Sequence, residues 1–284
     1  MLDTLPLRDD GHRPPGALGV PVPPASMPLL RGGRPRKTWR YVGAYGEDLM
    51  LCAASVHVGP AGQAFVGVWD RVRRELIDAV SLRAGMVDAG AGHLRARTKR
   101  VRLDLRTDEL TTDATAMEVT SPHGSQYIWT RKLPIRVTGT IHVDGVPRAF
   151  DAPGLIDDSA GYHARRTAWK WSAGVGTLTD GRAVTWNLVD GVHDALSASE
   201  RTVWVDGQPH EVGPVRFLDD LAGCTFREGG ELRCAIESER GQTSDYGLIA
   251  SHYRQPFGTF TGTLPGAGEL ATGYGVMEDH TAKW

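Results

Sequence analysis

The segment Ile135-Arg-Val-Thr-Gly-Thr-Ile-His-Val143 and the turn Asp144-Gly-Val-Pro147 that follows it decide the fold class. An apolar residue or glycine stands at each odd position of the segment, and a polar residue stands at each even position. Because successive side chains of a β-strand point to opposite faces, this alternation predicts a strand with one buried face. The Asp-Gly pair is typical of a tight turn, so the whole stretch predicts an antiparallel hairpin.

The same two signals recur along most of the chain. Residues 39–45 and 101–106 alternate in a similar way, and further Asp-Gly turns lie at Asp180 and Asp206. Half-buried strands joined by short turns are typical of antiparallel sheets. The chain is therefore predicted to be all-β, with roughly fifteen or more strands at the usual spacing.

One stretch, residues 68–80, fits both a helix and a hairpin. Its apolar residues from Trp69 to Val80 recur at helical spacing. The strands predicted on both sides of it favour a hairpin instead, and we expect that hairpin to turn near Arg73 and Arg74.

Residues 1–37 are rich in proline, glycine and arginine. Proline has no N–H to donate to a sheet and favours extended conformers, so this segment is predicted to be an irregular arm. The N-terminus lacks a basic region followed by an apolar run, and no apolar stretch reaches the length of a membrane span. We therefore expect neither an export signal nor a membrane span.

The composition argues against several classes of partner and compartment. The formal net charge is -2 at pH 7, so the overall charge does not favour binding to nucleic acid or to an anionic membrane. Cys52, Cys224 and Cys234 are odd in number and show no C-x-x-C spacing. We expect free thiols in a reducing compartment, and hence a cytoplasmic protein.

Motifs that bind cofactors are missing from the sequence. It contains no G-x-S-x-G, no G-x-x-x-x-G-K-[ST] and no G-x-G-x-x-G, which argues against hydrolase elbows, P-loops and dinucleotide sites. The ten histidines show neither H-x-H nor H-x-x-x-H spacing. The sequence therefore predicts no cofactor and no metal.

The largest collection of chemically active side chains lies at residues 157–174. It contains two carboxylates, an imidazole, a phenol, two guanidinium groups and two indoles. If a strand begins near Thr167, Trp169 and Trp171 share one face of it. Near the C-terminus, Glu278 stands in line with apolar residues, where burial is costly unless the carboxyl is paired or protonated. We expect Glu278 either beside an interior arginine or near the exit of its strand to water.

Two interpretations of these residues fit the sequence. A carboxyl group in an apolar cavity has a raised pKa and can donate a proton to a substrate, and indole faces can stabilise a cationic intermediate. Alternatively, Asp158 pairs with Arg165 or Arg166 and the tryptophans fill the core, because structural ion pairs shift pKa values as well.

Several motifs resemble an uncharacterised bacterial family known only as a domain of unknown function. They are T-x-W-x-W-S-x-G at 167–174, Q-x-F-G-x-F-x-G at 255–262 and G-x-x-E-x-H-x-x-x-W at 275–284. The resemblance covers residues 38–284. The family is distantly akin to carotenoid 1,2-hydratase and tocopherol cyclase, which implies two consecutive lipocalin-like barrels or half-barrels, calycin-like, with a lipophile-sized cavity.

One short stretch of the sequence also resembles a motif of the carotenoid hydratases. Gly161-Tyr162-His163 together with Trp169 is similar to the G-Y-H-x-H-x-W-G stretch of carotenoid hydratases. The second histidine of that stretch has no counterpart, since Arg165 and Arg166 stand in its place.

We therefore expect an arm at 1–37, a lipocalin-like domain at 38–150 and a second one at 151–284. The function expected is a cofactor-independent acid/base enzyme, a hydratase, isomerase or cyclase, that acts on an apolar small molecule such as an isoprenoid or polyketide. The candidate catalytic residues are Asp158 or Glu278 as the acid, with Tyr162 and His163 as relay or orienting groups. The candidate substrate-binding residues are Arg166, Trp169, Trp171, Trp186, Asn187 and Tyr274.

Two alternatives from other classes stay open. A carrier would use the same pocket to bind a lipophilic molecule without reaction, and an entirely apolar cavity would favour it. A partner-binding scaffold would have its cavity filled by its own side chains and an exposed apolar patch.

Overall fold

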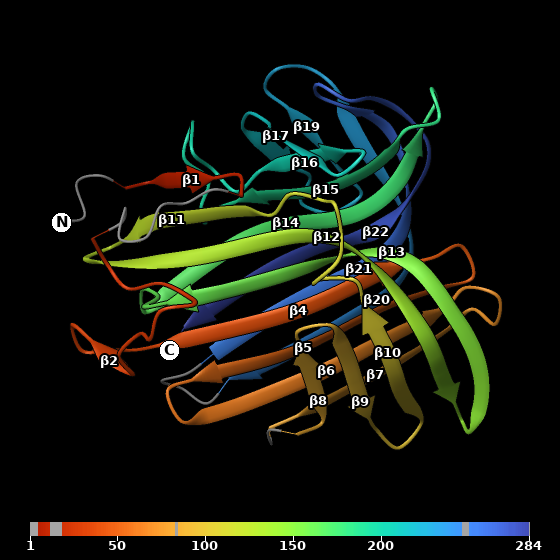
Figure 1. The fold of residues 1–284 in the computed structure, drawn as a ribbon, viewed down its shortest axis with the longest axis horizontal. Helices are drawn as coiled ribbons and strands as arrows, with labels where there is room; N and C mark the ends of the chain where they lie inside the picture. Colours follow the sequence, from red (N-terminus) through yellow and green to blue (C-terminus); the bar gives the residue numbers. More distant parts are fainter. Residues whose placement is uncertain (1–4, 12–18, 83–84, 246–249, 284) are drawn as a thin grey trace.

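The protein consists of two β-rich halves that pack against each other (Figure 1). The computed structural model describes residues 5–11, 19–82, 85–245 and 250–283. Every regular element in the described residues is a β-strand, twenty-two in all, which confirms the all-β prediction. Part of the predicted arm and Trp284, the last residue of the C-terminal motif, lie outside the described residues.

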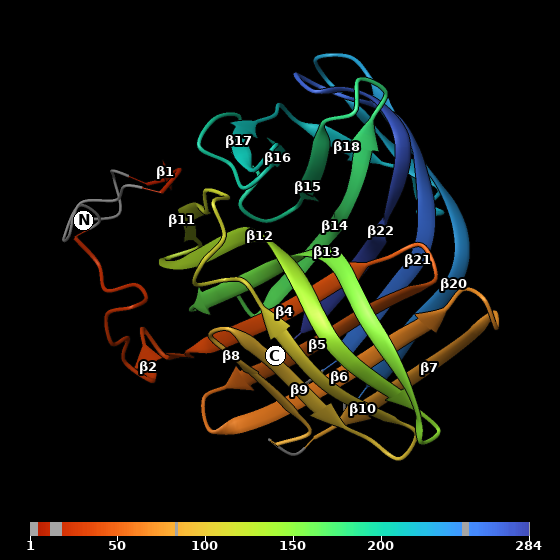
Figure 2. The same cartoon turned by 45° about the vertical axis from the view of Figure 1, so that its right-hand side comes forward.

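The first half is one eleven-stranded antiparallel sheet. Its strands are β1 (Leu7–Asp9), β4 (Lys37–Tyr45), β5 (Leu49–Val58), β6 (Ala61–Asp70), β7 (Glu75–Ser81), β8 (Val87–Gly90), β9 (His93–Arg97), β10 (Val101–Thr107), β11 (Met117–His123), β12 (Gln126–Val143) and β13 (Val146–Gly161). The main order is β7-β6-β5-β4-β13-β12-β10-β9-β8, and the edge strand β8 packs back against β5. The sheet thereby curls around an apolar core (Figure 2).

The second half is a nine-stranded antiparallel sheet in the order β17-β16-β15-β14-β22-β21-β20-β19-β18. Its strands are β14 (Arg166–Leu178), β15 (Ala183–Asp190), β16 (Thr202–Val205), β17 (Gln208–Glu211), β18 (Val215–Phe217), β19 (Gly223–Phe226), β20 (Glu231–Asp245), β21 (Ala250–Leu264) and β22 (Gly268–Lys283). It curls around a core of its own, so each half has the layered packing of a half-barrel.

The predicted turns form where the sequence places them. Asp144 and Gly145 join β12 to β13 with φ of 50° and 81°, the left-handed conformation that Asp-Gly pairs adopt in two-residue hairpins. Strands β6 and β7 pair antiparallel, with Asp70 opposite Glu75. This confirms a hairpin, and not a helix, at residues 68–80.

The border between the halves lies later in the chain than residue 150. Strand β13 stays paired with β12 as far as Gly161, opposite Ile128, and the second sheet begins at Arg166 with β14. The long β12–β13 hairpin is one uninterrupted ladder, so the carboxylates Asp157 and Asp158 belong to the first half.

A third apolar cluster joins the two halves. Tyr41 and Phe65 come from the first half, and Trp171 and Phe257 come from the second. The rings of Tyr41 and Trp171 meet edge to face, with centroids 5.5 Å apart. Strands β4, β13, β14 and β22 are therefore covered on both faces, by a half-core on one face and by the interface on the other.

The described part of the N-terminal arm is fastened to the first half. The short strands β2 (Leu30–Arg31) and β3 (Arg34–Pro35) pair with each other. The Tyr127 hydroxyl donates to the carbonyl of Pro21 at 2.5 Å, and the Tyr162 hydroxyl donates to that of Pro28 at 2.7 Å. The described part of the arm thus contains three short strands, and β1 pairs with β11 at the border of the first sheet (Figure 2).

Candidate active site between the two halves

A polar cavity lies within the aromatic interface between the halves. Its volume is about 70 Å³, which is enough for a few water molecules. In the first half, the odd-numbered residues of β4 and β13 face the cavity. In the second half, the odd-numbered residues of β14 and the even-numbered residues of β22 face the cavity. The lining includes Lys37, Trp39, Tyr41, Lys132, Asp157, His163, Trp169, Trp171, His193, Glu200 and Glu278.

Glu278 is the acid at the β22 end of the cavity. It is 4% exposed, and its carboxyl accepts hydrogen bonds from Trp169 Nε1 at 2.8 Å and from Gln255 Nε2 at 3.2 Å. Burial raises the pKa of Glu278 to about 7, although hydrogen bonds from Trp169 and Tyr253 oppose the rise. Both the acid and the carboxylate are thus populated near neutral pH.

Lys37 stands across the same end of the cavity. Its ammonium group lies 5.7 Å from the ring centroids of both Trp39 and Trp169. Burial lowers the pKa of Lys37 to about 7, and attraction to Glu278 only partly offsets this. A buried acid and a buried amine that both titrate near neutral pH can exchange protons with a bound molecule.

Lys132 forms the centre of the other end. Its ammonium group lies 2.5 Å from Asp157 Oδ1 and 3.5 Å from Glu200 Oε1. One ammonium group therefore faces two carboxyl groups. Its single positive charge can neutralise the negative charge of only one of them. Burial raises the pKa of Glu200 to about 7, in spite of attraction to Lys132.

Buried histidines complete this end of the cavity. His193 Nδ1 shares a hydrogen bond of 2.8 Å with the Ser121 hydroxyl. His163 Nδ1 is buried and has no hydrogen-bond partner within the described residues. Burial and the nearby lysines, Lys37 for His163 and Lys132 for His193, lower the pKa of both imidazoles. They are neutral at pH 7 and able to accept a proton only transiently.

The chain also matches a known family model. The model described as Domain of unknown function (DUF2804) matches residues 87–284. The chain belongs to the DUF2804 family. This confirms the resemblance seen in the sequence, and no curated protein matches the chain.

Solved structures share the fold of this DUF2804 protein. A protein of Nitrosomonas europaea assigned to AttH is 15% identical with a TM-score of 0.56, and the match covers 92% of this chain and 98% of that one. Kievitone hydratase of Nectria haematococca is 10% identical with a TM-score of 0.53, with 93% and 94% covered. At these identities the likeness shows the fold, which confirms the expected calycin-like architecture. The described residues contain no helix long and apolar enough to cross a membrane.

The DUF2804 structure brings several predicted site residues together. Glu278, His163, Trp169 and Trp171 all line the cavity. Asn187 lies just behind it and accepts a hydrogen bond of 2.8 Å from Trp171 Nε1. Asn187 also donates to the Glu200 carbonyl at 2.8 Å, so it positions cavity residues without lining the cavity itself.

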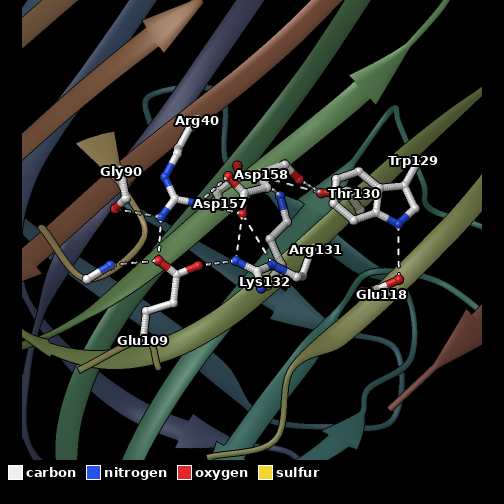
Figure 3. A network of polar contacts seen from close by, with 11 residues as sticks. Arg40, Gly90, Glu109, Glu118, Trp129, Thr130, Arg131, Lys132, Asp157 and Asp158 are labelled. Carbon is white, nitrogen blue, oxygen red and sulfur yellow. Dashed lines mark hydrogen bonds and ion pairs between the residues drawn. The ribbon is translucent and has the colours of Figure 1, made fainter. Parts of the chain in front are cut away.

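Asp158 does not face the cavity, because it points to the opposite side of β13 from Asp157. It accepts from Arg40 at 2.9 Å and from Arg131 at 2.8 Å, and both arginines reach Glu109 (Figure 3). The structural interpretation of Asp158 as an ion-pair partner is therefore correct, but its partners are these two arginines and not Arg165 or Arg166.

Four further predicted residues also lie away from the cavity. Tyr162 is adjacent to His163 in the chain, and its side chain points to the opposite side. The Tyr162 hydroxyl donates a hydrogen bond to the arm, at the carbonyl of Pro28. Trp186 is buried in the second half-core, where its Nε1 donates to Ser172 at 3.0 Å. Tyr274 lies under the guanidinium of Arg71 at 4.9 Å, and Arg166 is exposed at the start of β14.

Sequence reasoning missed Lys37, Lys132, Glu200 and His193. One signal was available, since the chain has only five lysines and two of them interrupt strands with apolar or aromatic residues. Lys37 and Lys132 are 5% and 3% exposed. Glu200 lies in the loop between β15 and β16, where no pattern in the sequence distinguishes it.

Proposed function

We propose that this protein is an acid/base enzyme that hydrates, isomerises or cyclises a largely apolar small molecule in the cavity between its halves. One observation carries the proposal: a buried carboxylic acid with a pKa of about 7, Glu278, borders a cavity walled by indole rings. Kievitone hydratase, a protein of similar fold, is named for a hydration, which supports the same reaction class.

For a hydration, the proposed steps use only side chains of this chain. Protonated Glu278 gives its proton to one carbon of a double bond, and the faces of Trp169 and Trp171 stabilise the resulting cation. A water at the opposite end adds to the neighbouring carbon. The carboxylate of Glu200 takes the proton that this water loses, and return of a proton to Glu278 completes the cycle.

The size of the cavity restricts what enters it. A drug-sized ligand occupies about 300 Å³ or more, whereas the cavity holds about 70 Å³. In our proposal the reacting end of the substrate and one water occupy the cavity. Its apolar body extends between the halves toward solvent.

A labelling experiment tests the proposal. Small molecules that copurify with the protein under native conditions are first identified by mass spectrometry. These molecules and a panel of isoprenoid and polyketide alkenes are then incubated with the protein in ¹⁸O-water. We expect one alkene to gain one labelled water, and this gain to fall by about 100-fold or more in Glu278→Gln. The control is Glu239→Gln, an exposed glutamate paired with Arg254 at 2.8 Å. Equal turnover in Glu278→Gln and the control would refute the proposed role of Glu278.

Non-catalytic binding of a lipophilic molecule remains the second candidate. The charged side chains of Lys37, Lys132 and Glu278 in the lining count against it, because a carrier was expected to have an entirely apolar cavity. Under this alternative a molecule copurifies unchanged, and Glu278→Gln alters its affinity without any labelled product in the wild-type reaction.

A further inference from the structure

A second and larger hollow lies in the first half, on the opposite face of β4 and β13 from the polar cavity. Its volume is about 690 Å³, within the range of about 300 to 1,000 Å³ that small-molecule sites occupy. The start of β4, the end of β5 and strand β8 surround it. Asp158 and Ala160 face this hollow, whereas Asp157 lines the polar cavity.

Hydrogen bonds hold the apolar wall of the hollow in a fixed position. Trp129 is 5% exposed, and its Nε1 donates to Glu118 at 3.1 Å, which fixes the plane of the indole. Pro23 and Pro24 of the arm form the side opposite the barrel. The hydrogen bond from Tyr127 to Pro21 holds this part of the arm in place.

The polar wall is a closed ring of four charges. Arg40 and Arg131 each contact both Asp158 and Glu109, at distances between 2.5 and 2.9 Å (Figure 3). Two cations and two anions cancel within the ring, so the ring itself has no net charge. Glu118 and Asp88 also line the hollow, and their carboxylates disfavour an anionic ligand.

Two donors of the ring lack a hydrogen-bond partner within the described residues, and one of them is Arg40 Nε, which is buried from solvent. Arg131 uses Nε and Nη2 for its bonds to Asp158 and Glu109. Its Nη1 has no hydrogen-bond partner within the described residues, and it is not among the atoms buried from solvent. A neutral oxygen acceptor near this nitrogen would satisfy it without disturbing the charge balance.

We propose that the hollow beneath the arm is a second, non-catalytic site that binds a neutral, mostly apolar small molecule through an aromatic wall and one carbonyl or hydroxyl oxygen. The site adjoins the proposed catalytic cavity at Trp39 and Ser159, which line both, but Asp158 faces the hollow and Asp157 faces the cavity from opposite sides of β13. Its occupancy therefore does not depend on whether Glu278 catalyses a reaction.

Nile red is a suitable probe, because it is neutral, carries a carbonyl oxygen and fluoresces strongly when it leaves water. We expect one molecule to bind per chain, and the affinity to fall about tenfold or more in Ala89→Phe, which fills the hollow. Val80→Phe is the matched control, since it enlarges a 37% exposed residue of the same half. It should bind Nile red like the wild type.

Two further variants keep the test decisive. Ser55→Leu fills the hollow from β5 and serves if Ala89→Phe does not fold, as judged by circular dichroism. Glu278→Gln should leave Nile red binding unchanged, which separates this site from the catalytic cavity. Unchanged affinity in both filled variants, or loss of binding in Glu278→Gln, would overturn the inference.

Discussion

At the scale of single residues, adjacent carboxylates have different environments because strand side chains alternate. Asp157 faces Lys132 in the cavity between the halves, and Asp158 faces two arginines inside the first half. The same alternation separates His163, which lines the cavity, from Tyr162, which anchors the arm. A shift of one position thus decides which group can take part in proton transfer.

Asp158→Asn should destabilise the fold and leave catalysis largely intact. Removal of its charge leaves Arg40 and Arg131 with only Glu109 between them. We expect a loss of about 2 kcal/mol, reduced by the partial exposure of both arginines. Urea denaturation measures the loss, and turnover with the identified alkene should stay within about threefold of wild type. Loss of turnover in a folded Asp158→Asn variant would return Asp158 to the catalytic candidates.

Protonation of Glu278 should make stability depend on pH. The pKa of Glu278 is about 7 in the folded protein and 4.5 for a free glutamate side chain, so between these values the folded state binds more protons than the unfolded state. The free energy of unfolding therefore falls as pH rises through this window. Glu200 has the same sign, and its pKa in the folded protein is also about 7.

Glu278→Gln removes one of these two contributions. From about pH 5 to about pH 8 the variant should lose less stability than the wild type, in urea denaturation at each pH. Glu239→Gln, at an exposed position, should follow the wild-type curve. Parallel curves for the wild type and Glu278→Gln would show that the carboxyl does not titrate in this window.

At the scale of elements, the T-x-W-x-W-S-x-G motif is a packing device as well as a cavity wall. Gly174 of β14 lies against Trp186 of β15, and a Cβ at residue 174 would come within 2.0 Å of the indole ring. Trp169 and Trp171 of the same strand face the cavity. The motif thus serves the second half-core and the interface with one strand.

Gly174→Ala should destabilise the protein by about 2 kcal/mol, because the indole of Trp186 has to leave its rotamer or the strand has to shift. Trp186→Leu should also destabilise it, by opening space in the core. The double variant should lose less than the sum of the two single variants, since the alanine then meets no ring. Thermal or urea denaturation of all three measures this coupling, and strict additivity would contradict it.

At the scale of the whole molecule, ion pairs join the two halves. Arg240 of β20 is 4% exposed, pairs with Asp78 of β7 at 2.9 Å and lies 4.1 Å above the ring of Phe65. Arg71 of the first half pairs with Glu237 of the second at 2.7 Å. These contacts join the two halves whose interface contains the polar cavity.

Arg240→Met should destabilise the protein by about 1 kcal/mol, because the buried guanidinium is lost from its pair with Asp78 and from the ring of Phe65, while solvent screens the exposed Asp78. It should also reduce turnover, since Gln255, which bonds to Glu278, lies within reach of Arg240 at 3.5 Å. Arg254→Met breaks only an exposed pair with Glu239 and should cost less than about 0.5 kcal/mol. Equal effects of the two substitutions in urea denaturation would show that the interface pair contributes little.

Much of the fold was predictable because its signals are local. Alternation at residues 135–143 and the Asp-Gly turn at Asp144 predict the hairpin that forms. The family motifs predicted the paired half-barrels, and Glu278, His163, Trp169 and Trp171 were identified as site candidates. A bulge in the β14–β22 ladder, where Leu178 pairs with Leu270, had no local signal.

The sequence alone determined the all-β class, the hairpins and the family. Only the tertiary structure decided which acid faces the cavity, since β4, β13, β14 and β22 are covered on both faces and polarity no longer distinguishes inside from outside. It also brought in Lys37, Lys132 and Glu200 from separate elements. The reason is physical: strand alternation is a property of neighbours in the chain, whereas the pKa of a buried group depends on charges that only packing of the two halves brings near.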